Sequence, residues 1–264
     1  MMLIRVLMEN NALNDQFIAE HGLSLYIEAN GKKILFDAGQ TDAFAQNAAN
    51  LGVDLSQVDL CVLSHGHYDH SGGLLHFLAI NDHAPVYMHR RAIEPHYNGT
   101  VKYIGIDEKL TDHPRVIYTD DESDLGYGMR LCTCNALACG CPASARGMTV
   151  KCGGVFVQDT FDHEQYLTIE ENGKRIVISG CSHKGILDIV KWLKPDVLIG
   201  GFHFVKLDPL GEDRAFLESA AEELLAHACV YYTGHCTGEA AFAFLKERMG
   251  GKLQAMPAGT EIIL

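Results

Sequence analysis

The sequence lacks any apolar run long enough to cross a membrane, and it has no excess of basic residues. No segment approaches the roughly 20 uninterrupted apolar residues of a membrane span. The N-terminal stretch is too short, and becomes acidic too soon at Glu9, for a secretory signal. Lysine and arginine total 21 against 34 aspartates and glutamates, which gives a net charge of −13. These absences argue against a membrane association and against a nucleic-acid partner, which would need a basic face.

The acidic balance does not exclude an anionic small-molecule substrate, because bound metal cations reverse the sign of the local field. The cysteine count is nine, an odd number, and no secretory signal accompanies it. This usage predicts reduced thiols and a cytoplasmic location. The oligomeric state is left open by the sequence.

The overall composition is that of an enzyme with its own core, with 47% hydrophobic and 21% charged residues. Hairpin patterns fill the N-terminal half, and strands alternate with helices in the C-terminal half. Neither half contains a linker of disordered composition, so we predict a single domain over residues 1–264. The hydrophobic pattern of helices and strands is lost at about 90–148, which we expect to be an irregular, cysteine-containing region.

Local signals place several elements within this domain. Asn-Gly pairs at 30–31 and 172–173 predict tight hairpins. Helices are predicted over residues 41–51, 184–193, 212–228 and 240–249. Thr41 is the expected N-cap of the first helix. The face expected to be buried in the third helix is formed by Phe216, Ala220, Leu224 and Ala228.

The most informative stretch is LCVLSHGHYDHSGGL at residues 60–74. An apolar strand leads into His65, His67, Asp69 and His70, and two glycines follow. Imidazole and carboxylate are the usual ligands of zinc, iron and manganese. Alternate residues of an extended segment point the same way, so His65 and His67 can bind one ion. The stretch therefore predicts a metal site rather than histidines of a surface loop.

Three more histidines, His183, His203 and His235, each follow an apolar strand. α/β enzymes place their chemistry at the ends of strands. We therefore expect these side chains to converge on the cluster at 65–70.

These residues resemble a known family. The segment SHGHYDH at 64–70 is similar to the H-x-H-x-D-H signature of the metallo-β-lactamase fold, and the strand exit at 37–39 and the late His235 fit that superfamily. The resemblance covers nearly the whole chain. It implies an α/β fold with four layers, an αββα sandwich, and a metal site at one edge of the sheets. Segments at 21–24, 180–186, 200–203 and 233–238 resemble one subgroup, described as metal-dependent hydrolases or as 7,8-dihydropterin-6-yl-methyl-4-(β-D-ribofuranosyl)aminobenzene 5′-phosphate synthases.

The resemblance implies one or two metal ions, and we predict a dinuclear site that holds two divalent ions, with zinc expected first and iron or manganese as alternatives. The expected ligands are His65, His67 and His183 for one ion, and Asp69, His70 and His235 for the other. Asp69 is also expected to act in catalysis. His203 is expected to be a proton donor or a substrate contact rather than a ligand.

One position departs from the superfamily pattern. Many members place a metal-bridging aspartate where this chain has Gly180-Cys181. The bridging ligand is therefore open among Cys181, Asp162, His163 and Glu164.

Three functions follow as hypotheses. The first is a hydrolase whose metal-bound hydroxide attacks an ester, a lactone or a phosphate-type small molecule. The second is a pterin-linked transferase, in which the metals activate a diphosphate leaving group. The third is a metal or redox sensor built on Cys132, Cys134, Cys139 and Cys141, whose C-x-C pairs are tighter than the usual C-x2-C spacing.

Overall fold

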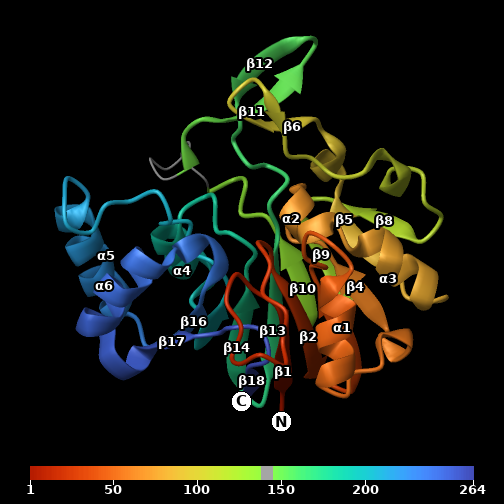
Figure 1. The fold of residues 1–264 in the computed structure, drawn as a ribbon, viewed down its shortest axis with the longest axis horizontal. Coiled ribbons are helices and arrows are strands. Elements are labelled where there is room, and N and C mark those ends of the chain that lie inside the picture. Colours follow the sequence, from red (N-terminus) through yellow and green to blue (C-terminus); the bar gives the residue numbers. More distant parts are fainter. Residues whose placement is uncertain (138–144) are drawn as a thin grey trace.

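Two seven-stranded β-sheets lie between two layers of helices in the computed structural model, which describes residues 1–137 and 145–264 (Figure 1). The first sheet has the order β18 (Glu261–Ile263), β1 (Leu3–Met8), β2 (Ser24–Ala29), β3 (Lys32–Phe36), β4 (Leu60–Val62), β5 (Val86–His89) and β8 (Val116–Thr119). The second sheet has the order β17 (Leu253–Ala255), β16 (Val230–Thr233), β15 (Val197–Ile199), β14 (Lys174–Ile178), β13 (Tyr166–Glu171), β10 (Met129–Cys132) and β9 (Glu122–Gly126).

A third, four-stranded sheet stands apart from these two, at the top of Figure 1. Its strands are β12 (Val155–Gln158), β11 (Met148–Cys152), β6 (His96–Asn98) and β7 (Lys102–Tyr103). The helices are α1 (Ala43–Asn50), α2 (Tyr68–Ser71), α3 (Leu74–Ile80), α4 (Ile186–Leu193), α5 (Arg214–Ala226) and α6 (Glu239–Met249). None of these described helices combines the length and the apolar character that a membrane crossing requires.

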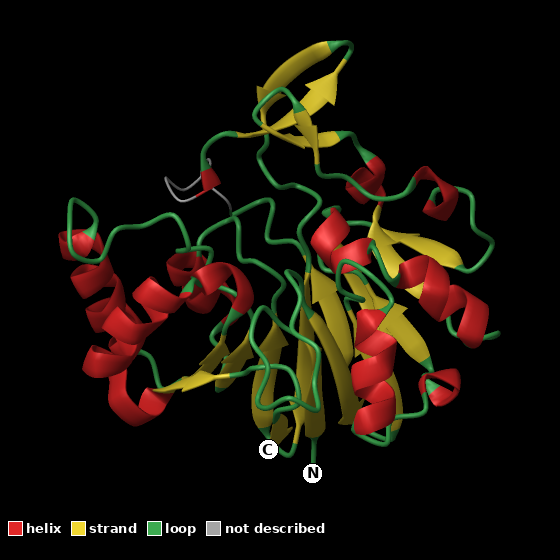
Figure 2. Cartoon of the chain, viewed as in Figure 1, coloured by secondary structure: helices red, strands yellow, loops and turns green. Residues whose placement is uncertain are grey.

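Three buried apolar clusters separate the layers. The central cluster lies between the two large sheets and includes Ile27, Val62 and Ile178. A second cluster packs α1 and α3 on the first sheet, and a third packs α4, α5 and α6 on the second. Full burial of each large apolar side chain stabilises the fold by about 1.5–3 kcal/mol. The helix–sheet–sheet–helix order in Figure 2 confirms the expected αββα sandwich.

The two predicted Asn-Gly hairpins are confirmed. Asn30 and Gly31 have φ values of 49° and 75° and join β2 to β3. Asn172 and Gly173, at 52° and 74°, join β13 to β14 in the same way. Positive φ at both central residues suits the right-handed twist of the paired strands.

Two expectations about helices were wrong in detail. In α5 the buried residues are Leu217, Ala220, Ala221 and Leu224, whereas Phe216 is 47% exposed and Ala228 lies beyond the helix end. The buried face is thus rotated by about one residue from the expected one. Thr41 is not the N-cap of α1, which begins after Asp42, although Thr41 Oγ1 accepts a hydrogen bond from the backbone N of Ala43 at 3.2 Å.

The region at 90–148 is more regular than expected. It contains β6 to β10, and β11 begins at Met148. These strands are two to five residues long, and several pair with segments distant in sequence, as β10 does with β13. Strands this short carry little periodicity, so the sequence pattern alone did not reveal them.

The arrangement of parallel strands positions the site. β3, β4, β5 and β8 run parallel in the first sheet, and β14 to β17 run parallel in the second. The loops that leave β4, β14, β15 and β16 carry the histidines at 65–70, 183, 203 and 235. These loops meet at one edge of the sandwich, beneath the third sheet (Figure 1).

Candidate metal centre

His65 and His183 face each other across the two sheets. Their Nε2 atoms are 3.3 Å apart, and both rings are buried. Burial, with neighbouring histidines second, lowers the pKa of both imidazoles well below the usual range, so both rings are neutral. Two nitrogens on one tetrahedral zinc ion, at 2.0–2.1 Å each, would be about 3.3 Å apart. His67 joins this pair, because its buried Nε2 has no hydrogen-bond partner and the three ligand atoms lie within 4.8 Å of one another.

Asp37 fixes the orientation of two imidazole rings, directly that of His70 and through Ser64 that of His65. Its Oδ2 lies 2.6 Å from His70 Nδ1 and accepts the hydroxyl hydrogen of Ser64 at 2.7 Å. Ser64 Oγ in turn lies 2.8 Å from His65 Nδ1. Both Nδ1 atoms are therefore engaged, which leaves each Nε2 free to bind an ion. Burial lowers the pKa of His70, but the Asp37 and Asp69 carboxylates together outweigh burial, so the net shift of this pKa is upward.

Asp69 is surrounded by a second group of imidazoles. Its Oδ2 lies 3.1 Å from His21 Nε2, 3.4 Å from His235 Nε2 and 3.8 Å from His70 Nε2. Burial raises the pKa of this carboxyl, but His70, His21 and His235 outweigh burial and hold the pKa well below its usual range. Asp69 is thus a carboxylate. His21, which the sequence analysis gave no role, lies at the rim with its side chain 52% exposed.

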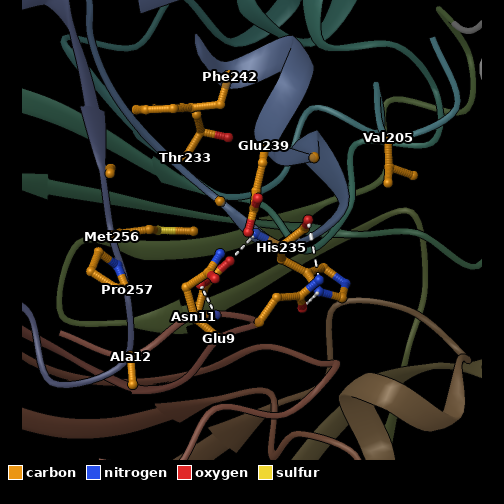
Figure 3. A pocket seen from close by; sticks show the side chains of 14 residues that line it. Glu9, Asn11, Ala12, Val205, Thr233, His235, Glu239, Phe242, Met256 and Pro257 are labelled. Atoms are coloured by element: carbon orange, nitrogen blue, oxygen red, sulfur yellow. Dashed lines mark hydrogen bonds between the residues drawn. The ribbon is translucent and has the colours of Figure 1, made fainter. Parts of the chain in front are cut away.

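His235 is held by residues from the opposite end of the chain. Its Nδ1 lies 2.8 Å from Asn10 Oδ1, and its backbone N donates to the buried carboxylate of Glu9 (Figure 3). A Cβ at Gly234 would come within 2.7 Å of Glu9 Oε1, so this close approach requires glycine. The sequence analysis missed Glu9 and Asn10, since no local pattern connects residues 9–10 with residue 235.

His203 completes the set of histidines at this edge. Its ring centroid lies 4.3 Å from that of His183, and neither of its ring nitrogens has a hydrogen-bond partner. His203 forms a possible ligand group with Cys181 and His183. A cleft of about 170 Å³ opens over the site and is lined by His21, His67, Asp69, Cys181, His183, His203, His235 and Cys236, among others.

The four residues considered for the bridging position differ in where their side chains lie. Cys181 Sγ is 3.2 Å from His70 Nε2 and groups with His65 and His70. Asp162 is paired with Arg91 instead. Glu164 accepts hydrogen bonds from the backbone N atoms of His183 at 2.7 Å and Lys184 at 3.1 Å. Of these, only the Cys181 thiol lies between the two groups of imidazoles.

His163 belongs to a cluster behind His67 that the sequence analysis did not predict. His96 Nδ1 lies 2.7 Å from Asp159 Oδ2, and His163 Nε2 lies 3.5 Å from the same oxygen. The backbone N of Gly66 donates to His163 Nδ1 at 2.9 Å. Burial lowers the pKa of His163 to about 4, so the ring is neutral and its single proton must be on Nε2. Although these residues are close enough to surround an ion, this tautomer favours a hydrogen-bond network over a metal site.

Only two cysteines of the predicted four-cysteine cluster lie among the described residues. Cys132 and Cys134 are free thiols, while Cys139 and Cys141 lie outside the described residues. The four-thiol site stays a prediction.

Comparisons with known proteins agree with this architecture. A sequence model of the metallo-beta-lactamase superfamily matches residues 18–132. An uncharacterized protein of Methanocaldococcus jannaschii is 31% identical over 93% of this chain and 94% of its own length. The 7,8-dihydropterin-6-methyl-4-(β-D-ribofuranosyl)-aminobenzene-5′-phosphate synthase of the same organism is 29% identical over 93% of this chain and 90% of its own.

Among solved structures, one described as a metal-dependent hydrolase of the β-lactamase superfamily is 29% identical. It superposes with a TM-score of 0.83 and covers 100% of this chain and 99% of its own. The family model, these relatives and the shared fold show that the chain belongs to the metallo-β-lactamase superfamily.

Proposed function

We propose that this protein is a metal-dependent hydrolase that acts on an ester, a lactone or a phosphate-type small molecule. The observation that carries the proposal is the cleft at the edge of the sheets, which is lined by the Asp69 carboxylate and by His67 and His203, whose buried ring nitrogens include atoms without a hydrogen-bond partner. Buried polar atoms normally have partners, so nitrogens without one, beside a carboxylate, support a site that binds ions. The solved relative described as a metal-dependent hydrolase supports the same conclusion.

The donor set suits two divalent ions. One ion would be held by His65, His67 and His183, and the other by Asp69, His70 and His235, with Cys181 between them. Imidazole, carboxylate and thiol together favour zinc, with iron and manganese as alternatives. When bound, such ions lower the pKa of a coordinated water and polarise the oxygen of the electrophile.

The protein's own residues supply orientation and proton transfer. Asp37 and Asn10 hold His70 and His235 with Nε2 directed into the site. His203, with neither ring nitrogen committed to another group, is placed to donate a proton to the leaving group. We also propose that the enzyme is a single domain and cytoplasmic; the described cysteines are all free, which supports the proposed location.

The test is turnover by zinc-, iron- and manganese-loaded protein on a panel of esters, lactones and phosphate esters. His67→Ala and Asp69→Ala should each lower kcat/KM by at least about a hundredfold. His83→Ala and Asp82→Ala are matched controls, since both side chains are more than half exposed and neither lines the cleft. Wild-type turnover in His67→Ala and Asp69→Ala on a responsive substrate would refute the proposal.

A pterin-linked transferase is the second candidate, favoured by the 29% identity to the synthase over nearly the full chain. The two reactions differ in the fate of water. A hydrolase incorporates oxygen from isotope-labelled water into its product, whereas a transferase consumes two substrates in equal amounts and incorporates none. Mass spectrometry of the products separates them.

A further inference from the structure

Two lysines from different parts of the chain line the cleft. Lys102 lies in β7 of the third sheet, and Lys206 follows the loop that carries His203. Lys102 Nζ lies 3.4 Å from Tyr68 Oη and 5.2 Å from the centre of that ring. Among the ion pairs of residues 1–137 and 145–264, none involves Lys102 or Lys206. Both ammonium groups are therefore available to a ligand.

The charge in the cleft changes sign from floor to mouth. Among the described residues that line it, Asp69 is the one acid, and its carboxylate is engaged by the histidines at the floor. The mouth carries the two lysines with the polar side chains of Asn98 and Tyr68. In a chain with a net charge of −13, this local excess of positive charge selects an anion. Two lysines match the two charges of a phosphate monoester better than the single charge of a carboxylate.

A larger, mainly apolar cavity adjoins the cleft. Its volume is about 460 Å³, within the range of small-molecule sites. His235 and Val205 line both spaces, so the cavity begins where the cleft ends. Its walls include Phe242, Met256 and Pro257 (Figure 3).

Of the two acidic residues that line this cavity, Glu9 and Glu239, the first is already committed to the protein. Glu9 is 2% exposed, and its two oxygens accept hydrogen bonds from the backbone N atoms of His235 and Asn11. It is therefore not available to recognise a cationic group. Glu239 is solvent-exposed, so what the cavity mainly gives a ligand is apolar surface of about the size of a ring.

From these two features we propose that the substrate is a phosphate-type anion with an apolar part. The anionic group lies between Lys102 and Lys206, and the apolar part occupies the cavity beyond His235. This assignment rests on the proposed function, because it describes the substrate of the same site.

Binding of phosphonates to zinc-loaded protein tests the proposal without relying on turnover, since a phosphonate is not hydrolysed. We expect calorimetry to show benzylphosphonate binding about tenfold more tightly than methylphosphonate, from burial of the ring, and more tightly than phenylacetate. The double variant Lys102→Glu/Lys206→Glu should weaken both phosphonates by at least about tenfold. Phe242→Ala should abolish the preference for the benzyl compound and leave methylphosphonate binding unchanged.

Matched controls separate these effects from general ones. Lys109→Glu/Lys174→Glu makes the same charge change at exposed lysines that do not line the cleft, and Phe216→Ala removes an exposed ring from the neighbouring helix α5. Equal weakening by the control pair, no weakening by Lys102→Glu/Lys206→Glu, or tighter binding of phenylacetate would each overturn the proposal. Lysine-dependent binding without any hydrolysis would refute only the proposed function. Hydrolysis of neutral esters without lysine-dependent binding would refute only this inference.

Discussion

Asn10 Oδ1 lies 2.8 Å from Nδ1 of His235, although 225 residues separate the two in sequence. An amide oxygen only accepts, so the contact requires a proton on Nδ1 and makes Nε2 the nitrogen that a metal ion would take. Nε2 is the atom that faces Asp69, at 3.4 Å from Oδ2. The loop that follows β1 thereby determines which nitrogen of a late histidine would be available to a metal ion.

Removing this contact should weaken one metal site and spare the other. Asn10→Ala is expected to lower zinc affinity at the Asp69 site about 10- to 100-fold, because His235 loses the group that orients its ring. Asn10→Asp retains an acceptor oxygen and should restore most of that affinity. Competition titrations with a chromophoric chelator would measure both ions, with Asn14→Ala, at an exposed position, as the control. Unchanged binding of both ions by Asn10→Ala would contradict this role.

Cys181 should leave a spectroscopic signature if its thiolate binds metal. Cobalt-substituted protein is expected to show thiolate-to-cobalt charge-transfer absorption in the near ultraviolet, and Cys181→Ser should lose it. Cys181→Asp should still bind two ions, because a carboxylate can take the same bridging position. Cys152→Ser, at an exposed thiol, serves as the control. Retention of the absorption in Cys181→Ser would show that another cysteine is responsible.

The sequence was sufficient for features in which a local pattern decides the structure. The two Asn-Gly hairpins follow from their turn residues, and the convergence of His65, His183 and His235 follows from histidines at strand ends. The αββα layers were implied by the resemblance of residues 64–70 to a family signature. The metal roles of these histidines stay predictions, but the structure does bring them together.

What the sequence did not reveal depends on contacts between distant segments. Glu9 and Asn10 act on a loop near the other end of the chain, and His96 meets Asp159 across a small sheet of short strands. The buried face of α5 was misplaced because Phe216 and Leu217 are both apolar and adjacent, so periodicity alone could not choose between them. Packing against α6 and the second sheet makes that choice.

Glu164 should matter for both stability and metal binding. It is fully buried and accepts hydrogen bonds from His183 N, Lys184 N and Tyr166 Oη. Glu164→Gln leaves only one acceptor oxygen for these donors, so we expect a loss of about 1–3 kcal/mol in the free energy of unfolding. Affinity for the ion near His183 should fall as well. Urea denaturation and zinc titration measure the two effects, and Glu170→Gln, whose side chain is 51% exposed, should change neither. Full retention of stability would show that these hydrogen bonds are replaced by water.

The low pKa of His163 predicts how the free energy of unfolding changes with pH in protein that is kept metal-free with a chelator. Burial lowers its folded-state pKa from the usual 6.5 to about 4, so between these values the unfolded chain binds a proton that the folded chain does not. The stabilising contribution is therefore complete above pH 6.5 and is lost as pH falls toward about 4, an effect of about 3 kcal/mol. His163→Asn, whose Oδ1 can still accept from Gly66 N, should flatten the unfolding free energy over this range. His83→Asn, at a half-exposed site, should leave the wild-type slope. An equally steep loss of stability in His163→Asn would assign the acid sensitivity to other buried groups.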